Sequence, residues 1–194
     1  MKKLFFTLLL LCPISILVSQ NLKMGLYIAP SVNSININDF TEGKKKISFN
    51  YGYIIEYAFT DNHALESGFE ISKKSGEIEN VEYKVNYLTL PFQVKMKSRA
   101  FGYFTYFAKT GPSLGIKLRD NVHVDGSSEL YQNEGEAKNL ILTLNVSIGA
   151  EYSLMQASSV YAELFIKNGI TRGWKNSYET FLFNQFGLSL GFLF

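Results

Sequence analysis

FGLSLGFLF, residues 186–194, is the last stretch of the chain and the one that decides its fold. Every second residue is large and apolar, and the residues between them are glycine or serine except for Leu193. Because the side chains of a β-strand point alternately to its two faces, this period of two predicts a strand with one apolar face and one face of small residues. The apolar face consists of Phe186, Leu188, Leu190, Phe192 and Phe194.

A strand of this kind that ends on an aromatic residue resembles the closing strand of bacterial outer-membrane β-barrels. In those proteins the terminal aromatic residue is part of the signal that the assembly machinery recognises. The resemblance implies that the apolar residues of 186–194 act as an assembly signal, and that the outer-membrane assembly machinery is a partner.

The same alternation recurs along the chain. It is clearest in 47–60 and 140–154, where large apolar residues take one face and mostly small or polar residues take the other. In 81–97 the apolar residues change parity near Tyr87, which a β-bulge or a departure from the membrane would explain. The complete set of predicted strands covers 23–35, 47–60, 64–73, 81–97, 101–116, 140–154, 159–170 and 182–194.

The links between these strands alternate in length. Those at 60–63, 97–100 and 154–158 are tight, whereas those at 36–46, 74–80, 117–139 and 171–181 are longer and polar. An up-and-down barrel with short periplasmic turns and long extracellular loops has this alternation, and it places both termini in the periplasm. We therefore predict an all-β protein, an eight-stranded antiparallel up-and-down transmembrane β-barrel in the outer membrane.

The small-residue faces distinguish this barrel from a soluble, lipocalin-like ligand carrier. An eight-stranded barrel has an interior just wide enough for side chains. Residues such as Gly52, Ser147 and Gly149 suit it, whereas rows of Phe, Tyr and Leu would crowd it. The apolar faces are therefore expected to contact lipid. Tyrosines near strand ends also suit the level of the lipid headgroups, although aromatic residues favour β-structure in any case: Tyr51, Tyr53, Tyr57, Tyr83, Tyr87, Tyr106, Tyr152 and Tyr161.

Residues 1–19 are typical of a cleaved signal peptide, because two lysines precede an apolar stretch too short to span a bilayer as a helix. This leaves 20–194 as the barrel domain. The only cysteine, Cys12, leaves with the signal, so disulfides and cysteine chemistry are excluded from the mature chain. Loss of Lys2 and Lys3 reduces 19 basic residues to 17, against 17 acidic ones. A neutral chain does not favour nucleic acid as a partner.

Two short motifs carry a family resemblance. YLTLPFQVK, residues 87–95, resembles the signature strand of the PorT-like outer-membrane barrels that are widespread in Bacteroidetes, including a proline, Pro91, that would otherwise be unusual in a strand. KTGPSLG, residues 109–115, is similar to the fifth-strand element of that family. The resemblance implies an eight-stranded outer-membrane barrel. It implies no activity, because most members have none, and it leaves an envelope or secretion-system protein as a candidate partner.

Charged residues occur on the face predicted to line the lumen. In so narrow an interior they must be paired or hydrated, because an unpaired buried ion costs several kcal/mol. Two interpretations follow: a gated path for protons or small ions, or a structural network that plugs the lumen, which we favour. The residues are Glu56, Glu66, Glu70, Lys95, Glu151, Glu163 and Lys167.

A catalytic site is not predicted. His123 lies near Asp125, Ser127 and Ser128, but clustering in sequence does not create triad geometry, and a solvated loop is the simpler interpretation. No metal-ligand spacing or phosphate-binding glycine loop occurs, so we expect no metal and no cofactor. An outer-membrane enzyme acting on lipid A or peptide remains the alternative.

The predicted role is therefore structural, adhesive or in envelope assembly, by a monomer in the lipid bilayer. Recognition would fall to the loops, above all 117–139. A run of lysines in the first loop would suit the phosphates of lipopolysaccharide, although a solvated loop end is the interpretation that we favour: Lys44, Lys45 and Lys46.

Overall fold

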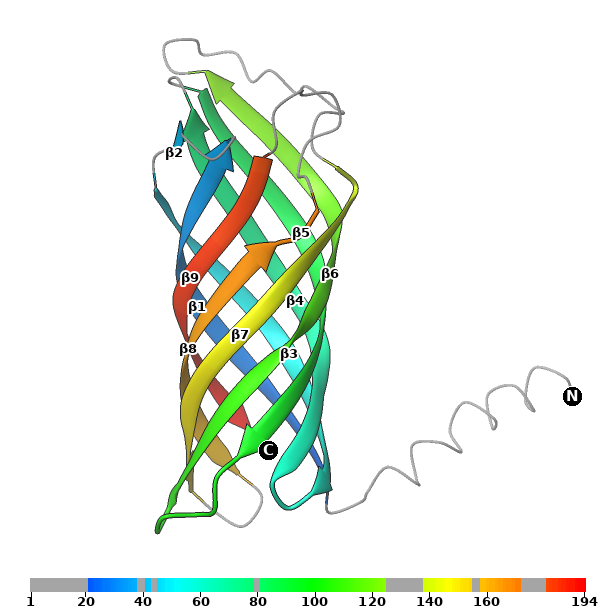
Figure 1. Ribbon diagram of the computed structural model, residues 1–194, viewed down its shortest axis with the longest axis vertical. Helices are drawn as coiled ribbons and strands as arrows, with labels where there is room; N and C mark the ends of the chain where they lie inside the picture. Colours follow the sequence, from blue (N-terminus) through cyan, green and yellow to red (C-terminus); the bar gives the residue numbers. More distant parts are fainter. Residues whose placement is uncertain are drawn as a thin grey trace, which may run out of the picture.

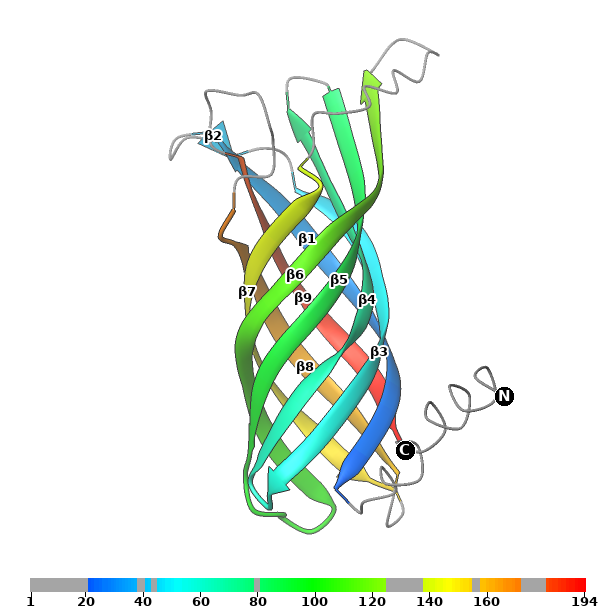
Figure 2. The same ribbon diagram turned by 90° about the vertical axis from the view of Figure 1, so that its right-hand side faces the viewer.

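The computed structural model describes residues 21–37, 41–42, 45–78, 81–124, 138–154, 158–171 and 181–194. In these residues, nine strands form one antiparallel sheet that closes into a barrel because β1 also pairs with β9 (Figures 1 and 2). The strands are β1 (Leu22–Ile37), β2 (Thr41–Glu42), β3 (Lys46–Thr60), β4 (His63–Ile78), β5 (Val81–Lys97), β6 (Phe104–Val124), β7 (Leu140–Ser153), β8 (Ser159–Gly169) and β9 (Phe181–Leu193).

Eight of these strands make up the wall. β2 has two residues and pairs only with the end of β1, through Asn36↔Glu42 and Ile37↔Thr41. The predicted fold, an all-β barrel of eight antiparallel strands, is confirmed. In the part of the chain that the structure describes, no helix is long and apolar enough to cross a membrane. The predicted signal peptide, 1–19, lies outside the described residues.

The register sets the shape of the barrel. Following paired residues once around the wall from Leu22 leads back to β1 at Val32, a stagger of ten residues. With usual strand dimensions, this stagger corresponds to strands tilted by about 40° from the barrel axis. The path runs through Leu22, Tyr57, Leu65, Val94, Thr110, Val146, Ile166, Phe186 and Val32.

The outer face is apolar and the inner face is polar. In β9 the side chains of Phe186 and Leu190 are exposed, whereas those of Gln185 and Ser189 between them are buried in the lumen. The strands β3 and β7 show the same division, with their predicted apolar faces outward. The lipid-facing assignment of these faces therefore agrees with the closed barrel.

The two ends of the barrel differ. We call the end that carries Phe194 and the links 61–62, 98–103 and 154–158 the turn end, and the opposite one the loop end. At the loop end β4, β5 and β6 extend beyond the other strands (Figure 2).

Three predicted boundaries were wrong. The link 74–80 is not a long loop, because β4 runs to Ile78 and β5 begins at Val81; the alternation of link lengths fails there. Residues 117–124 of the predicted loop 117–139 belong to β6 and pair with β5. Outside the apolar wall, alternation between apolar and polar residues no longer marks a strand. At the turn end, the strand predicted from 101 starts at Phe104 because Gly102 takes a positive φ of 63° in a turn.

The apolar residues of β5 do change faces near Tyr87, but β5 has no bulge there. Val85, Tyr87 and Thr89 all point inward, like Lys95 further along the strand. The register shift near Tyr87 lies instead in β6, which accommodates one extra residue, Leu118. The sequence misleads here because the lumen is locally apolar, with Val85 and Tyr87 packed beside Ile141.

Two prolines lie where the ladder is interrupted. The β4–β5 register has no pair between Ser67↔Phe92 and Glu70↔Thr89, and Pro91 lies in this gap. The β5–β6 register has a similar gap between Pro91↔Ser113 and Val94↔Thr110, beside Pro112. Because proline has no amide hydrogen to donate, these interruptions let both prolines occupy wall strands.

Candidate functional site: the charged lumen

All seven charged residues predicted to line the lumen are buried inside the barrel, each at most 9% exposed. They come from five strands: Glu56 from β3, Glu66 and Glu70 from β4, Lys95 from β5, Glu151 from β7, and Glu163 and Lys167 from β8. The structure arranges them in three groups.

The first group is centred on Lys95. Its ammonium group donates hydrogen bonds to Glu56 at 2.6 Å and to Glu151 across the lumen. Glu56 also accepts a hydrogen bond from Lys97. Two carboxylates on β3 and β7 are thus neutralised by two lysines of β5.

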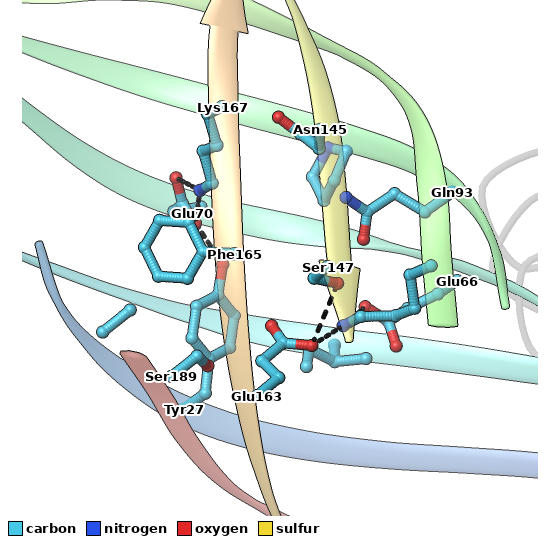
Figure 3. Close-up of a pocket in the computed structure, with 14 residues that line it drawn as sticks. Tyr27, Glu66, Glu70, Gln93, Asn145, Ser147, Glu163, Phe165, Lys167 and Ser189 are labelled. Carbon is cyan, nitrogen blue, oxygen red and sulfur yellow. Dashed lines mark hydrogen bonds and ion pairs between the residues drawn. The ribbon is translucent and has the colours of Figure 1, made fainter. Parts of the chain in front are cut away.

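The second group is centred on Lys109 of β6. Its ammonium nitrogen lies 2.8 Å from Glu66 and 2.6 Å from Glu163. The hydroxyl of Ser147 donates a further hydrogen bond of 3.4 Å to Glu163 (Figure 3). A 4.0 Å contact between Lys95 and Glu66 connects this group to the first.

The third group joins opposite sides of the barrel. Lys167 of β8 donates hydrogen bonds to both carboxylate oxygens of Glu70 on β4. The phenol of Tyr27 on β1 donates to the same carboxylate at 2.5 Å (Figure 3). Glu70 is therefore held by residues from two other strands.

Sequence reasoning missed three lumen lysines. Lys109 lies on the same face of its strand as Phe107 and Ser113. The alternation along that strand could therefore have identified it as a lumen residue. Lys97 lies at a strand end, and Lys74 was assigned to a loop although it is only 3% exposed. Lys74 lies 5.6 Å from the centre of the Phe183 ring. With these three, the five glutamates buried in the described lumen are balanced by five lysines.

Single aromatic side chains share the lumen with these charges, although the predicted rows of Phe, Tyr and Leu face outward. Four of them lie over glycines directly opposite on the neighbouring strand, where a Cβ would come within 3 Å of the ring. A glycine leaves room for a ring to lie flat against the wall. The pairs are Tyr27–Gly52, Phe107–Gly149, Phe165–Gly187 and Tyr161–Gly191.

Two tyrosines expected at the lipid headgroups, Tyr87 and Tyr161, are therefore inside the barrel. The ring of Tyr161 packs edge-on against Phe107, with the two ring centres 6.2 Å apart. Lys95 lies 4.3 Å and Lys109 5.5 Å from the centre of the Phe107 ring. These cation–π contacts add to the ion pairs in stabilising the buried lysines.

The remaining space is small. The cavity between the second and third groups has a volume of about 30 Å³, which suits a water molecule or two. Towards the turn end, Ile54, Phe107, Tyr161 and Leu193 form an apolar cluster. The described lumen is thus filled by ion pairs, aromatic rings and apolar side chains.

The other candidate residues are not brought together. The backbone of His123 belongs to β6, whereas Asp125, Ser127, Ser128 and Lys44 lie outside the described residues. His63 lies at the start of β4, where its ring nitrogen is 3.1 Å from the hydroxyl of Thr60. Among the residues that the structure describes, no group of three or more His, Cys, Asp or Glu side chains could hold a metal ion.

Comparisons with known proteins agree with this architecture. A family model described as outer membrane protein beta-barrel domain matches residues 18–194. No curated protein matches the chain. Among solved structures, Neisserial surface protein A superimposes with a TM-score of 0.58 at 10% identity, over 88% of this chain and 95% of that one. OprG from Pseudomonas aeruginosa gives a TM-score of 0.54 at 11% identity, over 90% and 96%. At these identities the similarity concerns the fold alone.

Proposed function

Because the chain belongs to the outer membrane protein beta-barrel domain family, we propose that it is a plugged scaffold of the outer membrane, with a structural, adhesive or envelope-assembly role and no catalytic site. The barrel presents its loop-end surface on a rigid wall. It conducts neither protons nor small ions.

The ion-paired lumen is the observation that supports this proposal. The carboxylates of Glu56, Glu66 and Glu70 all contact a lysine from another strand. Opening a path would separate such pairs in a low-dielectric interior and leave ions unpaired, at a cost of several kcal/mol for each. A functional gate would need a second arrangement of nearly equal energy, and a neutral, interlocked network does not favour one.

Conductance across a planar lipid bilayer tests the proposal. The purified, folded protein should give no steady single-channel current, and neither should Lys95→Met or Glu70→Gln. Before insertion, each variant is checked for the folded band that migrates differently before and after boiling. A large gain of conductance in either folded variant would instead support a gate.

The proposed orientation places the turn end and the carboxyl terminus in the periplasm. Support comes from the two-residue link 61–62 and the short link 154–158 at the turn end, because outer-membrane barrels have short periplasmic turns. The proposed partners follow from this arrangement. They are the assembly machinery for the closing strand, lipopolysaccharide around the loop end, and an envelope or secretion-system protein for the loop-end surface.

A further inference from the structure

The outer wall of β4, β5 and β6 changes from apolar to cationic over two to four residues near the loop end. The register aligns Ile71, Leu88 and Ile116 in one row across the three strands. The next outward row contains Lys73, Asn86 and Arg119, and the one after it contains Lys84. We call Lys73, Lys84 and Arg119, whose side chains are all exposed, the cationic rim.

When the apolar rows lie in the bilayer core, the cationic rim reaches the height of a headgroup layer. Each strand rises about 3.3 Å per residue, so the first rim row lies about 7 Å along the strand from the last apolar row. Lysine and arginine stems can lie along apolar wall while their charges reach the interface. The charges of the rim therefore face groups attached directly to the acyl chains, and not only distant solvent.

The turn end carries a different rim. Exposed aromatic side chains dominate its outer face, and they contact one another: Tyr103 and Phe104 lie 5.8 Å and 5.0 Å from Tyr152, measured between ring centres. Aromatic belts suit either membrane interface, because their rings are amphipathic. A cationic rim is selective, because it favours an interface that carries negative charge. The asymmetry of the two rims thus matches a membrane whose two leaflets differ in charge.

The residue types point to phosphate. The guanidinium of Arg119 presents a planar set of donors that matches phosphate oxygens, and Lys73 and Lys84 add point charges beside it. The phosphates of lipopolysaccharide are attached to its lipid portion, at the level where the rim lies. We propose that Lys73, Lys84 and Arg119 form a binding site on the outer wall for the phosphate groups of lipopolysaccharide.

This site differs from the lysine run expected to make such contacts. Lys45 and Lys46 precede or begin β3, whereas the cationic rim spans three other strands. The inference rests on the proposed orientation only for its place in the cell. The binding itself is tested in a symmetric membrane, so its failure is distinguishable from a wrong orientation.

The test uses the folded protein in nanodiscs of zwitterionic phosphatidylcholine, with binding followed by native mass spectrometry. The probes are bisphosphorylated lipid A, the same lipid without phosphates, and inorganic phosphate. We compare Lys73→Gln/Arg119→Gln with Lys45→Gln/Arg99→Gln, the control variant, which removes the same two charges from exposed positions outside the rim. A single variant, Lys84→Gln, keeps the test valid if the double rim variant does not fold.

Bisphosphorylated lipid A should bind, and the double rim variant should weaken its binding by at least about tenfold, because each interfacial cation contributes substantially to anionic lipid binding. The control variant should bind like the unmodified protein, and the lipid without phosphates should bind weakly. Equal binding by both double variants would overturn the proposal. So would displacement of the lipid by equimolar inorganic phosphate, which would indicate a site for the free ion.

Discussion

Lys95 makes the largest number of charged contacts in the described lumen. Its ammonium group touches Glu56, Glu66 and Glu151, which lie on three different strands. It also lies over the ring of Phe107. A single side chain therefore links β3, β4, β5 and β7 across the interior, and its loss would leave carboxylates buried without their main partner.

Lys95→Met should lower the free energy of unfolding by about 3–5 kcal/mol, because breaking a buried ion pair leaves an uncompensated charge. Denaturant titration in detergent micelles, read from the fraction of heat-modifiable folded band, measures the loss. Lys45→Met removes an exposed lysine and serves as the matched control. Equal midpoints for the two variants would show that the lumen network contributes little to stability.

Gly191 is a second single residue on which the stability of the barrel depends, because it leaves space for a neighbouring ring. A Cβ at this position would come within 3 Å of three atoms of the Tyr161 side chain, two in the ring and the phenolic oxygen. Gly191→Val should therefore destabilise the barrel by about 1–3 kcal/mol, the usual cost of overpacking. Adding Tyr161→Ala should recover part of this loss, because the two residues are in contact and their effects are not additive. A double variant that loses the full sum of both effects would contradict the ring-over-glycine arrangement.

At the scale of elements, β9 closes the barrel, and its predicted faces hold. Phe194, just beyond its end, exchanges two backbone hydrogen bonds with Met24 on β1, of 2.7 and 2.8 Å. Its ring is exposed and lies 6.0 Å from that of Phe192. Phe194 thus combines a backbone role in the seam with an exposed aromatic ring, which is the feature expected of the assembly signal.

Deletion of Phe194 should reduce the folded fraction recovered from the outer membrane more than any loop substitution, for which Lys45→Ala is the reference. Phe194→Ala separates the two roles, because it keeps the backbone pair and removes the ring. If the ring is the signal, both changes impair assembly in cells, while the Phe194→Ala protein still folds in detergent. Normal assembly of both variants would remove 186–194 as a signal.

The strands that were predicted best are those with a different environment on each face. β3, β7 and β9 cross the wall with lipid on one side and the lumen on the other, so a period of two is visible over their length. The ends of β4 and β6 extend beyond the apolar wall, and there 74–78 and 117–124 have no alternation to reveal them. The composition of 74–80 resembles a loop because pairing at the loop end does not require apolar residues.

At the scale of the whole molecule, closure of the barrel brings together residues that are far apart in the chain. The stagger of ten residues brings Lys167 on β8 to Glu70 on β4, although 97 positions separate them in the chain. It also places the cationic rim on one side of the loop end only. The orientation of the barrel in the membrane decides which of its two ends faces the periplasm.

The proposed orientation predicts different labelling of the two ends in intact cells. Lys45→Cys introduces a thiol near the loop end, and Asp61→Cys introduces one in the turn between β3 and β4; both positions are exposed. A membrane-impermeant maleimide should label Lys45→Cys, whereas Asp61→Cys should react only after the outer membrane is permeabilised. The reverse pattern would place the termini outside.

The sequence by itself determined the two faces of most wall strands, because the parity of a strand is a local property that repeats every two residues, although it placed Tyr87 and Tyr161 on the wrong side. It therefore identified eight wall strands and seven of the charged lumen residues. Only the tertiary structure decided which charges pair, that rings lie over Gly52 and Gly191, and that Lys74 is buried. These features depend on register and closure, which bring together residues from strands far apart in the chain.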